Sequence, residues 1–158
     1  MKRLLLAFAL VSGFTLSPAA TRAAEPAKLG QGDPVENKAV RVVAMRFLSE
    51  IDGGRVGNTW ALVGDYLRGV LTRAEWEKGI IDARAGRPPV DRDLLGALFT
   101  PELDGNRKGH FFIVVYKTRY GSQWYQERVI LTLQGKEWKV DGYWMLPSDE
   151  KGEELKQR

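Results

Sequence analysis

The chain of 158 residues contains no cysteine and only one histidine, His110. The absence of cysteine excludes disulfide bonds, a thiolate nucleophile, a cysteine metal site and a lipoprotein anchor, which requires a cysteine at the cleavage site. A single histidine supplies no second ligand for a metal ion. We therefore predict no metal site and no cofactor. We also predict a core filled largely by the five Trp, five Tyr and six Phe of the chain.

Long apolar runs are also missing, because none reaches the roughly 18–20 residues that a membrane-spanning helix needs. The longest run, over residues 4–16, follows Lys2 and Arg3 and precedes a stretch of small residues. This order of positive charge, apolar run and small residues is typical of a secretory signal peptide. We predict a signal peptide over residues 1–23, export to the periplasm or the medium, and no membrane anchor.

Most of the excess of positive over negative charge lies in the predicted signal peptide. The full chain has 24 basic and 20 acidic residues and a net charge of +4. Lys2, Arg3 and Arg22 leave with the signal peptide, so the remaining 21 basic residues face the same 20 acidic ones at a net charge of +1. This near balance gives no general reason to expect a nucleic-acid partner.

The first half of the remaining chain has the apolar period of helices. Residues 24–37 show no such period, and we expect a flexible leader there. Helices are expected over residues 40–51 and 56–70, where apolar residues recur every three or four positions. Thr72 and Glu75 have the spacing of a capping box that opens a third helix, and Gly86, Pro88 and Pro89 end it.

The second half has the period of strands, which we expect over residues 94–99, 110–120, 124–133 and 138–146. Glu127 interrupts an otherwise apolar strand face. Alternation in the last strand places Trp138, Val140, Trp144 and Leu146 on one face and Lys139, Asp141 and Tyr143 on the other.

The order of these segments predicts one α+β domain over residues 38–147, with about three helices packed on one face of a curved, mostly antiparallel sheet of about four strands. A charged, disordered tail is expected over residues 148–158.

Several short stretches resemble an uncharacterised family of short exported bacterial proteins, domain of unknown function 4019. They are Phe47–Gly54, Asn58–Trp60, Tyr66–Arg68, Thr72–Trp76, Ala83-Arg84, Asp91-Arg92 and Gly142-Tyr143. The resemblance covers roughly residues 40–146. It implies a cystatin-like or nuclear-transport-factor-like fold, with helices cupped against a curved sheet, and it implies no activity.

Arg84 and Arg92 are the candidate binding residues, because guanidinium groups match planar anions. We hypothesise that they hold a small anionic ligand, or an acidic group of a protein partner, near Trp76 and Tyr143. The alternative is structural, with both arginines neutralised by acidic residues nearby in the sequence, which are Asp82, Asp91 and Asp93.

No catalytic residues are assigned, since the pattern from Ser148 to Lys151 and the lone His110 both lack the partners that catalysis needs. The first function class is therefore an exported, non-catalytic binding or interaction module. A small lyase, isomerase or hydrolase is the second, and a pocket containing Asp141 and Tyr143 would favour it. A structural envelope protein is the third, and a filled cup would favour it.

Overall fold

A computed structural model of the chain describes residues 32–103 and 107–155. The predicted signal peptide, most of the expected leader, residues 104–106 and the last residues, 156–158, lie outside the described residues. The elements follow in the order α1 (Pro34–Asp52), the 3-10 helix η1 (Val56–Leu62), α2 (Asp65–Val70), α3 (Arg73–Arg84), β1 (Asp91–Leu103), β2 (Arg107–Tyr120), β3 (Gln123–Gln134) and β4 (Glu137–Ser148).

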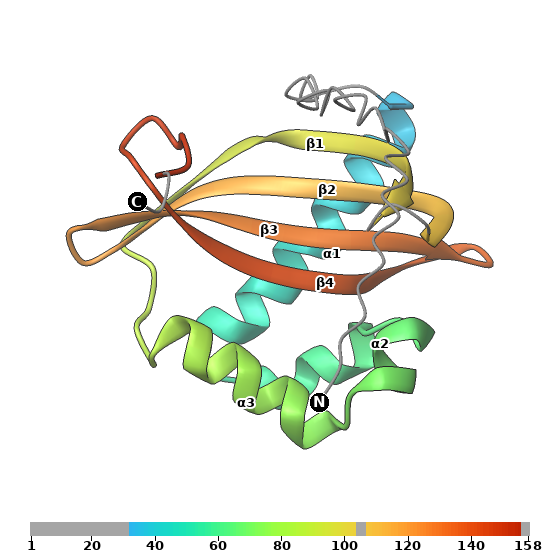
Figure 1. Cartoon of the computed structure of the whole chain (residues 1–158), viewed down its shortest axis with the longest axis horizontal. Coiled ribbons are helices and arrows are strands. Elements are labelled where there is room, and N and C mark those ends of the chain that lie inside the picture. Colours follow the sequence, from blue (N-terminus) through green and yellow to red (C-terminus); the bar gives the residue numbers. More distant parts are fainter. Residues whose placement is uncertain (1–31, 104–106, 156–158) are drawn as a thin grey trace, which may run out of the picture.

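The strands form one antiparallel sheet in the order β1-β2-β3-β4. Figure 1 shows the sheet curving in front of α1, which crosses behind it and emerges past the edge strand β1, while α2 and α3 lie beyond β4. This arrangement confirms the predicted α+β class. In the described part of the chain, no helix is long and apolar enough to cross a membrane.

The main core lies between the helices and the sheet. Apolar residues at helical spacing on α1 meet alternate residues of β2, β3 and β4. The fully buried members of this core include Val40, Ala44, Phe47, Leu48, Phe112, Val114, Val129, Leu131 and Val140. The apolar face of α1 therefore packs against the apolar face of the sheet, as the helical and strand periods of the sequence predict.

The helix expected over residues 56–70 is wrong as a single element. It is divided into η1 and α2 at Val63, whose backbone is extended and pairs with Val140 of β4. Gly64 continues this contact by donating its N–H to the carbonyl oxygen of Val140 at 2.8 Å. The backbone here makes hydrogen bonds to β4 in place of the hydrogen bonds that a continuous helix would have made. This tertiary contact explains why the helix is interrupted although the apolar spacing is helical.

The predicted start and end of α3 are confirmed. The Thr72 hydroxyl accepts from the backbone N–H of Glu75 at 3.3 Å, and the Thr72 N–H donates to the Glu75 carboxylate at 2.7 Å. Ala85 ends the helix in the left-handed conformation, with φ of 48°, and Gly86 follows with φ of 67°.

A β-bulge in β4 corrects the predicted strand faces. Ile130 pairs with Gly142 and Leu131 pairs with Val140, so Asp141 is the extra residue. Beyond the bulge the faces exchange. Tyr143 packs against the main core, while Trp144, expected on the apolar face, is 47% exposed.

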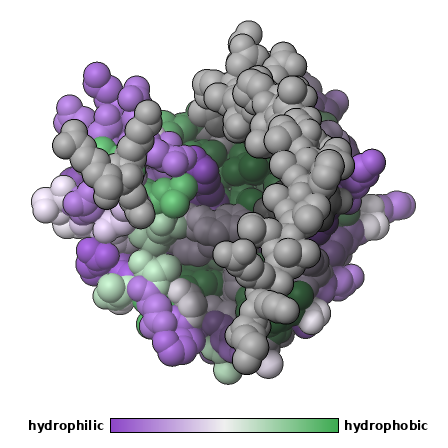
Figure 2. All heavy atoms as spheres, in the orientation of Figure 1, coloured by the Kyte–Doolittle hydropathy of each residue, from purple (hydrophilic) through white to green (hydrophobic). Residues whose placement is uncertain are grey.

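The face of the sheet away from the helices carries a second, smaller apolar cluster of Leu103, Phe111 and Ile130. Figure 2 looks onto this face and shows apolar residues over its middle and hydrophilic ones along its left side.

Both expected flexible ends differ in part from the structure. α1 begins at Pro34, inside the expected leader, because Asp33 caps it by accepting from the N–H of Val35 at 2.8 Å. Residues 148–155, expected as a disordered tail, fold back along β3 and β4. Leu155 donates its N–H to Pro147 at 3.0 Å, and Glu154 pairs with Arg128.

Candidate functional site

Arg84 and Arg92 lie together in a buried polar cluster between the ends of α1 and α3 and the core face of the sheet. The cluster consists of Asp52, Arg84, Arg92, Thr118, Tyr120, Glu127 and Tyr143. We call this set the buried charge cluster. Asp52 is the last residue of α1, Arg84 is the last of α3, and Arg92 lies at the start of β1.

Glu127 is the centre of the buried charge cluster, and its side chain is fully buried. One carboxylate oxygen accepts from Arg84 at 2.7 Å, from the Tyr120 hydroxyl at 2.7 Å and from the Tyr143 hydroxyl at 2.5 Å. The other oxygen accepts from Arg92 at 2.9 Å and from the Thr118 hydroxyl at 2.5 Å. The interruption that Glu127 makes in the apolar face of β3 therefore places a carboxylate among buried donors.

Asp52 closes the other side of the cluster. Its carboxylate accepts from Arg92 at 2.5 and 3.1 Å and also from Arg84. The two guanidinium groups thus face two carboxylates, and the four charges balance. Buried charges are tolerated in this way only when paired and hydrogen-bonded.

The electrostatics of the cluster keep both carboxylates ionised. Burial alone would raise the pKa of Glu127, but the positive charges of Arg84 and Arg92 and the hydrogen bonds from Thr118 and Tyr143 hold that pKa below its usual value. Burial opposes ionisation of Asp52 too, and hydrogen bonds from both arginines lower its pKa. Burial beside the Glu127 charge raises the pKa of Tyr143, so its hydroxyl remains a donor.

The structure brings three of the four predicted binding residues together. Tyr143 accepts from Arg84 Nε at 2.9 Å, and Arg92 shares both carboxylates with Arg84. Trp76 lies apart from them. Its ring packs 6.0 Å from that of Phe47, and its N–H donates to the buried Thr59 hydroxyl at 2.9 Å. Binding of an anion by these four residues stays a prediction, and a ligand there would compete with Asp52 and Glu127.

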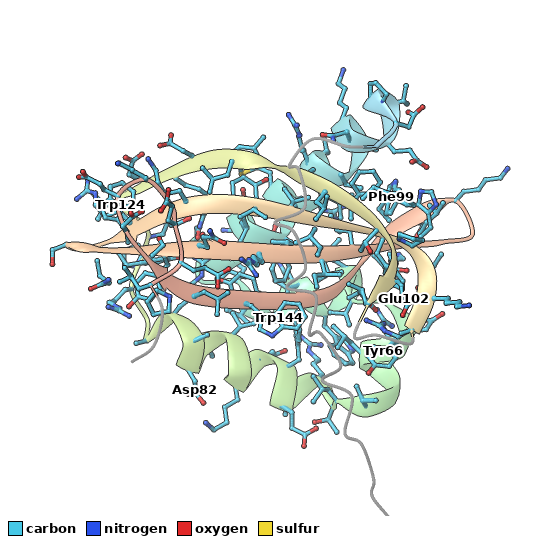
Figure 3. The ribbon with its side chains drawn as sticks, turned by 45° about the horizontal axis from the view of Figure 1, so that its top comes forward. Tyr66, Asp82, Phe99, Glu102, Trp124 and Trp144 are labelled. Atoms are coloured by element: carbon cyan, nitrogen blue, oxygen red, sulfur yellow. The ribbon has the colours of Figure 1, made fainter. Side chains whose placement is uncertain are left out.

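The carboxylates that neutralise the arginines are not the ones proposed from sequence proximity. Asp82 pairs with Lys78, and Figure 3 shows it on the side of α3 away from the sheet. Asp93 pairs with Lys117 at 3.1 Å. Asp52 and Glu127 are far from both arginines in the sequence, so proximity could not identify them. The break in alternation at Glu127 was the available signal.

A pocket containing both Asp141 and Tyr143 would have favoured an enzyme, but the ion pair of Asp141 and the hydrogen bonds of Tyr143 lie in different places. The bulge in β4 directs Asp141 to Arg107, 2.5 Å away, while Tyr143 belongs to the buried charge cluster.

A second site, which the sequence did not indicate, lies between α1 and the β1 edge of the sheet. It is a groove of about 800 Å³. Residues of α1 from Pro34 to Ser49 form one wall, and Leu94 of β1 and Tyr116 of β2 lie opposite. We call it the α1–β1 groove. Its exposed apolar residues are Val42, Met45 and Leu94, and its cations are Lys38, Arg41 and Arg46.

The three cations of the α1–β1 groove have no acidic partner among the described residues. None of the described residues that line the groove is acidic, and none of its three cations forms a salt bridge with a described residue. Arg46 helps to lower the pKa of Glu50, but that carboxylate is hydrogen-bonded by Arg55 and Asn58.

A polar group in the same groove also lacks a partner among the described residues. Arg41 Nε is buried and makes no hydrogen bond there. Tyr116 and Asn37, of which only 2% and 8% are exposed, line the same groove. Burial raises the pKa of Tyr116, opposed by the charges of Arg92 and Arg41, so the hydroxyl stays a donor at neutral pH. Buried polar groups usually have partners, so Arg41 Nε, which has none among the described residues, is a donor available to a ligand.

Comparison with known proteins identifies a family and no activity. No curated protein and no solved structure matches the chain, so the cystatin-like or nuclear-transport-factor-like fold stays a prediction. One family description, "Protein of unknown function (DUF4019)", matches residues 43–143. Because this match spans more than half of the chain and includes Asp52, Arg84, Arg92, Glu127 and Tyr143, the chain belongs to the DUF4019 family.

Proposed function

We propose that this protein is an exported, non-catalytic binding module and that it binds a small anion in the α1–β1 groove. The observation that carries the proposal is the positive charge of that groove, where Lys38, Arg41 and Arg46 surround an open site and no described residue of the lining supplies a carboxylate. The buried charge cluster is less suited to this role, because Asp52 and Glu127 already neutralise its arginines.

Three features of the groove favour a small molecule over a large partner. Its volume lies within the range of roughly 300–1,000 Å³ that small-molecule sites occupy. Arg41 and Tyr116 offer donors from opposite walls, which can orient one group between them. Exposed apolar side chains next to those donors supply contact area, as exposed apolar patches at binding sites do.

A fluorescent anionic probe, anilinonaphthalene sulfonate, tests the proposal directly. We expect saturable binding of one probe per folded chain. Arg41→Gln removes a charged donor and should weaken probe binding roughly tenfold. Lys38→Gln, at an exposed position of the same groove, should weaken it less.

Arg73→Gln is the matched control, since Arg73 lies on α3 and pairs with Glu77. It removes the same charge from a residue that does not line the groove and should leave the affinity unchanged. Thermal melts establish that each variant is folded. A native protein that does not bind the probe, or equal losses in the Arg41 and Arg73 variants, would refute an anion site in this groove.

Export is the other part of the proposal, and the N-terminal order of charge, apolar run and small residues supports it. Intact mass spectrometry of protein recovered from the exported fraction should show loss of the first 23 or 24 residues. A full-length mass, or protein confined to the cytoplasm, would contradict export.

A further inference from the structure

The α1–β1 groove is elongated as well as basic, and its shape bears on the kind of anion it accepts. Its α1 wall runs from Pro34 to Ser49, about 22 Å at the rise of an α-helix. Asn37, Arg41, Met45 and Ser49 recur every four residues along this wall, so they form one continuous stripe. A single compact anion would contact only a short part of such a stripe.

Polar and apolar groups are separated by depth in the groove. Tyr116 is almost fully buried and Arg41 Nε is buried, so these two donors lie deep in the groove, one on each wall. Val42, Met45 and Leu94 are 63%, 43% and 39% exposed, so the apolar surface lies toward the mouth. A ligand that uses both needs a charged head and a long apolar tail.

We propose that the ligand of the α1–β1 groove is a long-chain carboxylic acid in its ionised form. The carboxylate accepts from Arg41 and from the Tyr116 hydroxyl. The hydrocarbon chain lies along α1 against Met45 and Leu94, and Lys38 and Arg46 keep the mouth positive. This inference rests on the proposed function and adds the chemical class of the ligand.

Charge and burial together favour a carboxylic acid over a neutral lipid. An alcohol with the same tail would leave the Arg41 charge without a counterion, whereas a carboxylate supplies both the counterion and an acceptor for the buried Arg41 Nε. A short acid would satisfy Arg41 but leave the exposed apolar wall in water. Both parts of the ligand therefore contribute to affinity, and each can be removed separately.

Displacement of bound anilinonaphthalene sulfonate measures the two contributions. We expect octanoate, decanoate and dodecanoate to displace the probe with affinity rising roughly two- to fourfold per methylene, as expected for partly buried hydrocarbon. Acetate and octanol should displace it at least tenfold more weakly than octanoate. Affinity that is independent of chain length, or equal for octanol and octanoate, would overturn the inference.

Substitutions locate the tail and the head. Met45→Asp places a negative charge on the apolar wall and should weaken dodecanoate at least tenfold. Ile81→Asp is its matched control, because Ile81 is similarly exposed but lies on α3. Arg41→Gln should weaken every acid by a similar factor and reduce the preference for octanoate over octanol. Equal effects of Met45→Asp and Ile81→Asp would overturn the placement of the tail.

Failure of this inference is distinguishable from failure of the proposed function. If the probe binds and Arg41→Gln weakens it, but no long-chain acid displaces it, the groove binds anions of another class and only the inference is wrong. If the probe does not bind at all, the anion site itself is wrong.

Discussion

Glu127 is the residue on which the buried charge cluster depends most. It accepts hydrogen bonds from two arginines, two tyrosines and one threonine while its side chain is completely buried. Glu127→Gln keeps the shape but removes the charge that balances Arg84 and Arg92. We expect a loss of roughly 3–5 kcal/mol in the free energy of unfolding, the usual cost of breaking a buried ion pair. Urea melts of the variant and the native protein measure it.

Asp82→Asn is the matched control for Glu127→Gln. Asp82 also pairs with a cation, Lys78, but both side chains are mostly exposed. Solvent screens such pairs, so the urea midpoint should not change measurably. If the two substitutions cost the same, Glu127 is not an essential counterion of the buried arginines.

The end of α3 carries backbone strain that a substitution can relieve. Ala85 has φ of 48°, a left-handed conformation that costs an L-residue with a Cβ roughly 1–2 kcal/mol. Ala85→Gly should therefore stabilise the protein, by up to about 1 kcal/mol, because glycine adopts this conformation freely but loses more entropy on folding. Thermal or urea melts check the sign.

Ala83→Gly tests whether position, and not glycine itself, produces that gain. Ala83 lies on the exposed side of α3 in ordinary helical conformation. Glycine there should destabilise the protein by about 1 kcal/mol. Effects of the same sign at both positions would show that Ala85 is not strained in solution.

The elements were predictable wherever local chemistry determines them. The Thr72 capping box, the end of α3 and the alternation of β2 and β3 all depend on residues close in sequence, and each is present in the structure. The division between η1 and α2 was not predictable, because it depends on Val63 pairing with Val140. The bulge at Asp141 was missed for a similar reason, since a simple alternation contains no signal for an extra residue.

The candidate site was predictable only in part. Arg84, Arg92 and Tyr143 were selected from the sequence and meet in the structure, but their counterions Asp52 and Glu127 were not selected. Both acids reach the arginines through tertiary folding. The α1–β1 groove was missed altogether, because it combines an outward face of α1 with Tyr116, a residue of the sheet that the strand pattern assigns to the core.

At the scale of the whole molecule, the buried charge cluster connects two helices to the sheet. Asp52 and Arg84 end α1 and α3, and the remaining members come from all four strands. Because the chain has no cysteine, no disulfide bond can link the helices to the sheet. These contacts therefore couple the helical layer to the sheet, and loosening them should affect the cooperativity of the whole domain.

This coupling makes stability depend on pH in a predictable direction. The pKa of Glu127 is lower in the folded protein than its ordinary value of 4.5, because Arg84 and Arg92 outweigh the effect of burial. A carboxyl group with a lowered folded pKa stabilises the fold fully above its ordinary pKa. That stabilisation is lost as the pH falls below the ordinary value and through the folded one.

Glu127→Gln isolates this contribution from all other carboxyl groups, since the variant and the native protein share them. The difference in unfolding free energy between the two should be largest near pH 7 and should shrink as the pH falls below 4.5, the ordinary pKa of a glutamate. Urea melts of the variant and the native protein across this range measure the difference. A difference that stays constant over the whole range would mean that folding does not lower the pKa of Glu127, and the stabilisation of its charge by Arg84 and Arg92 would be wrong.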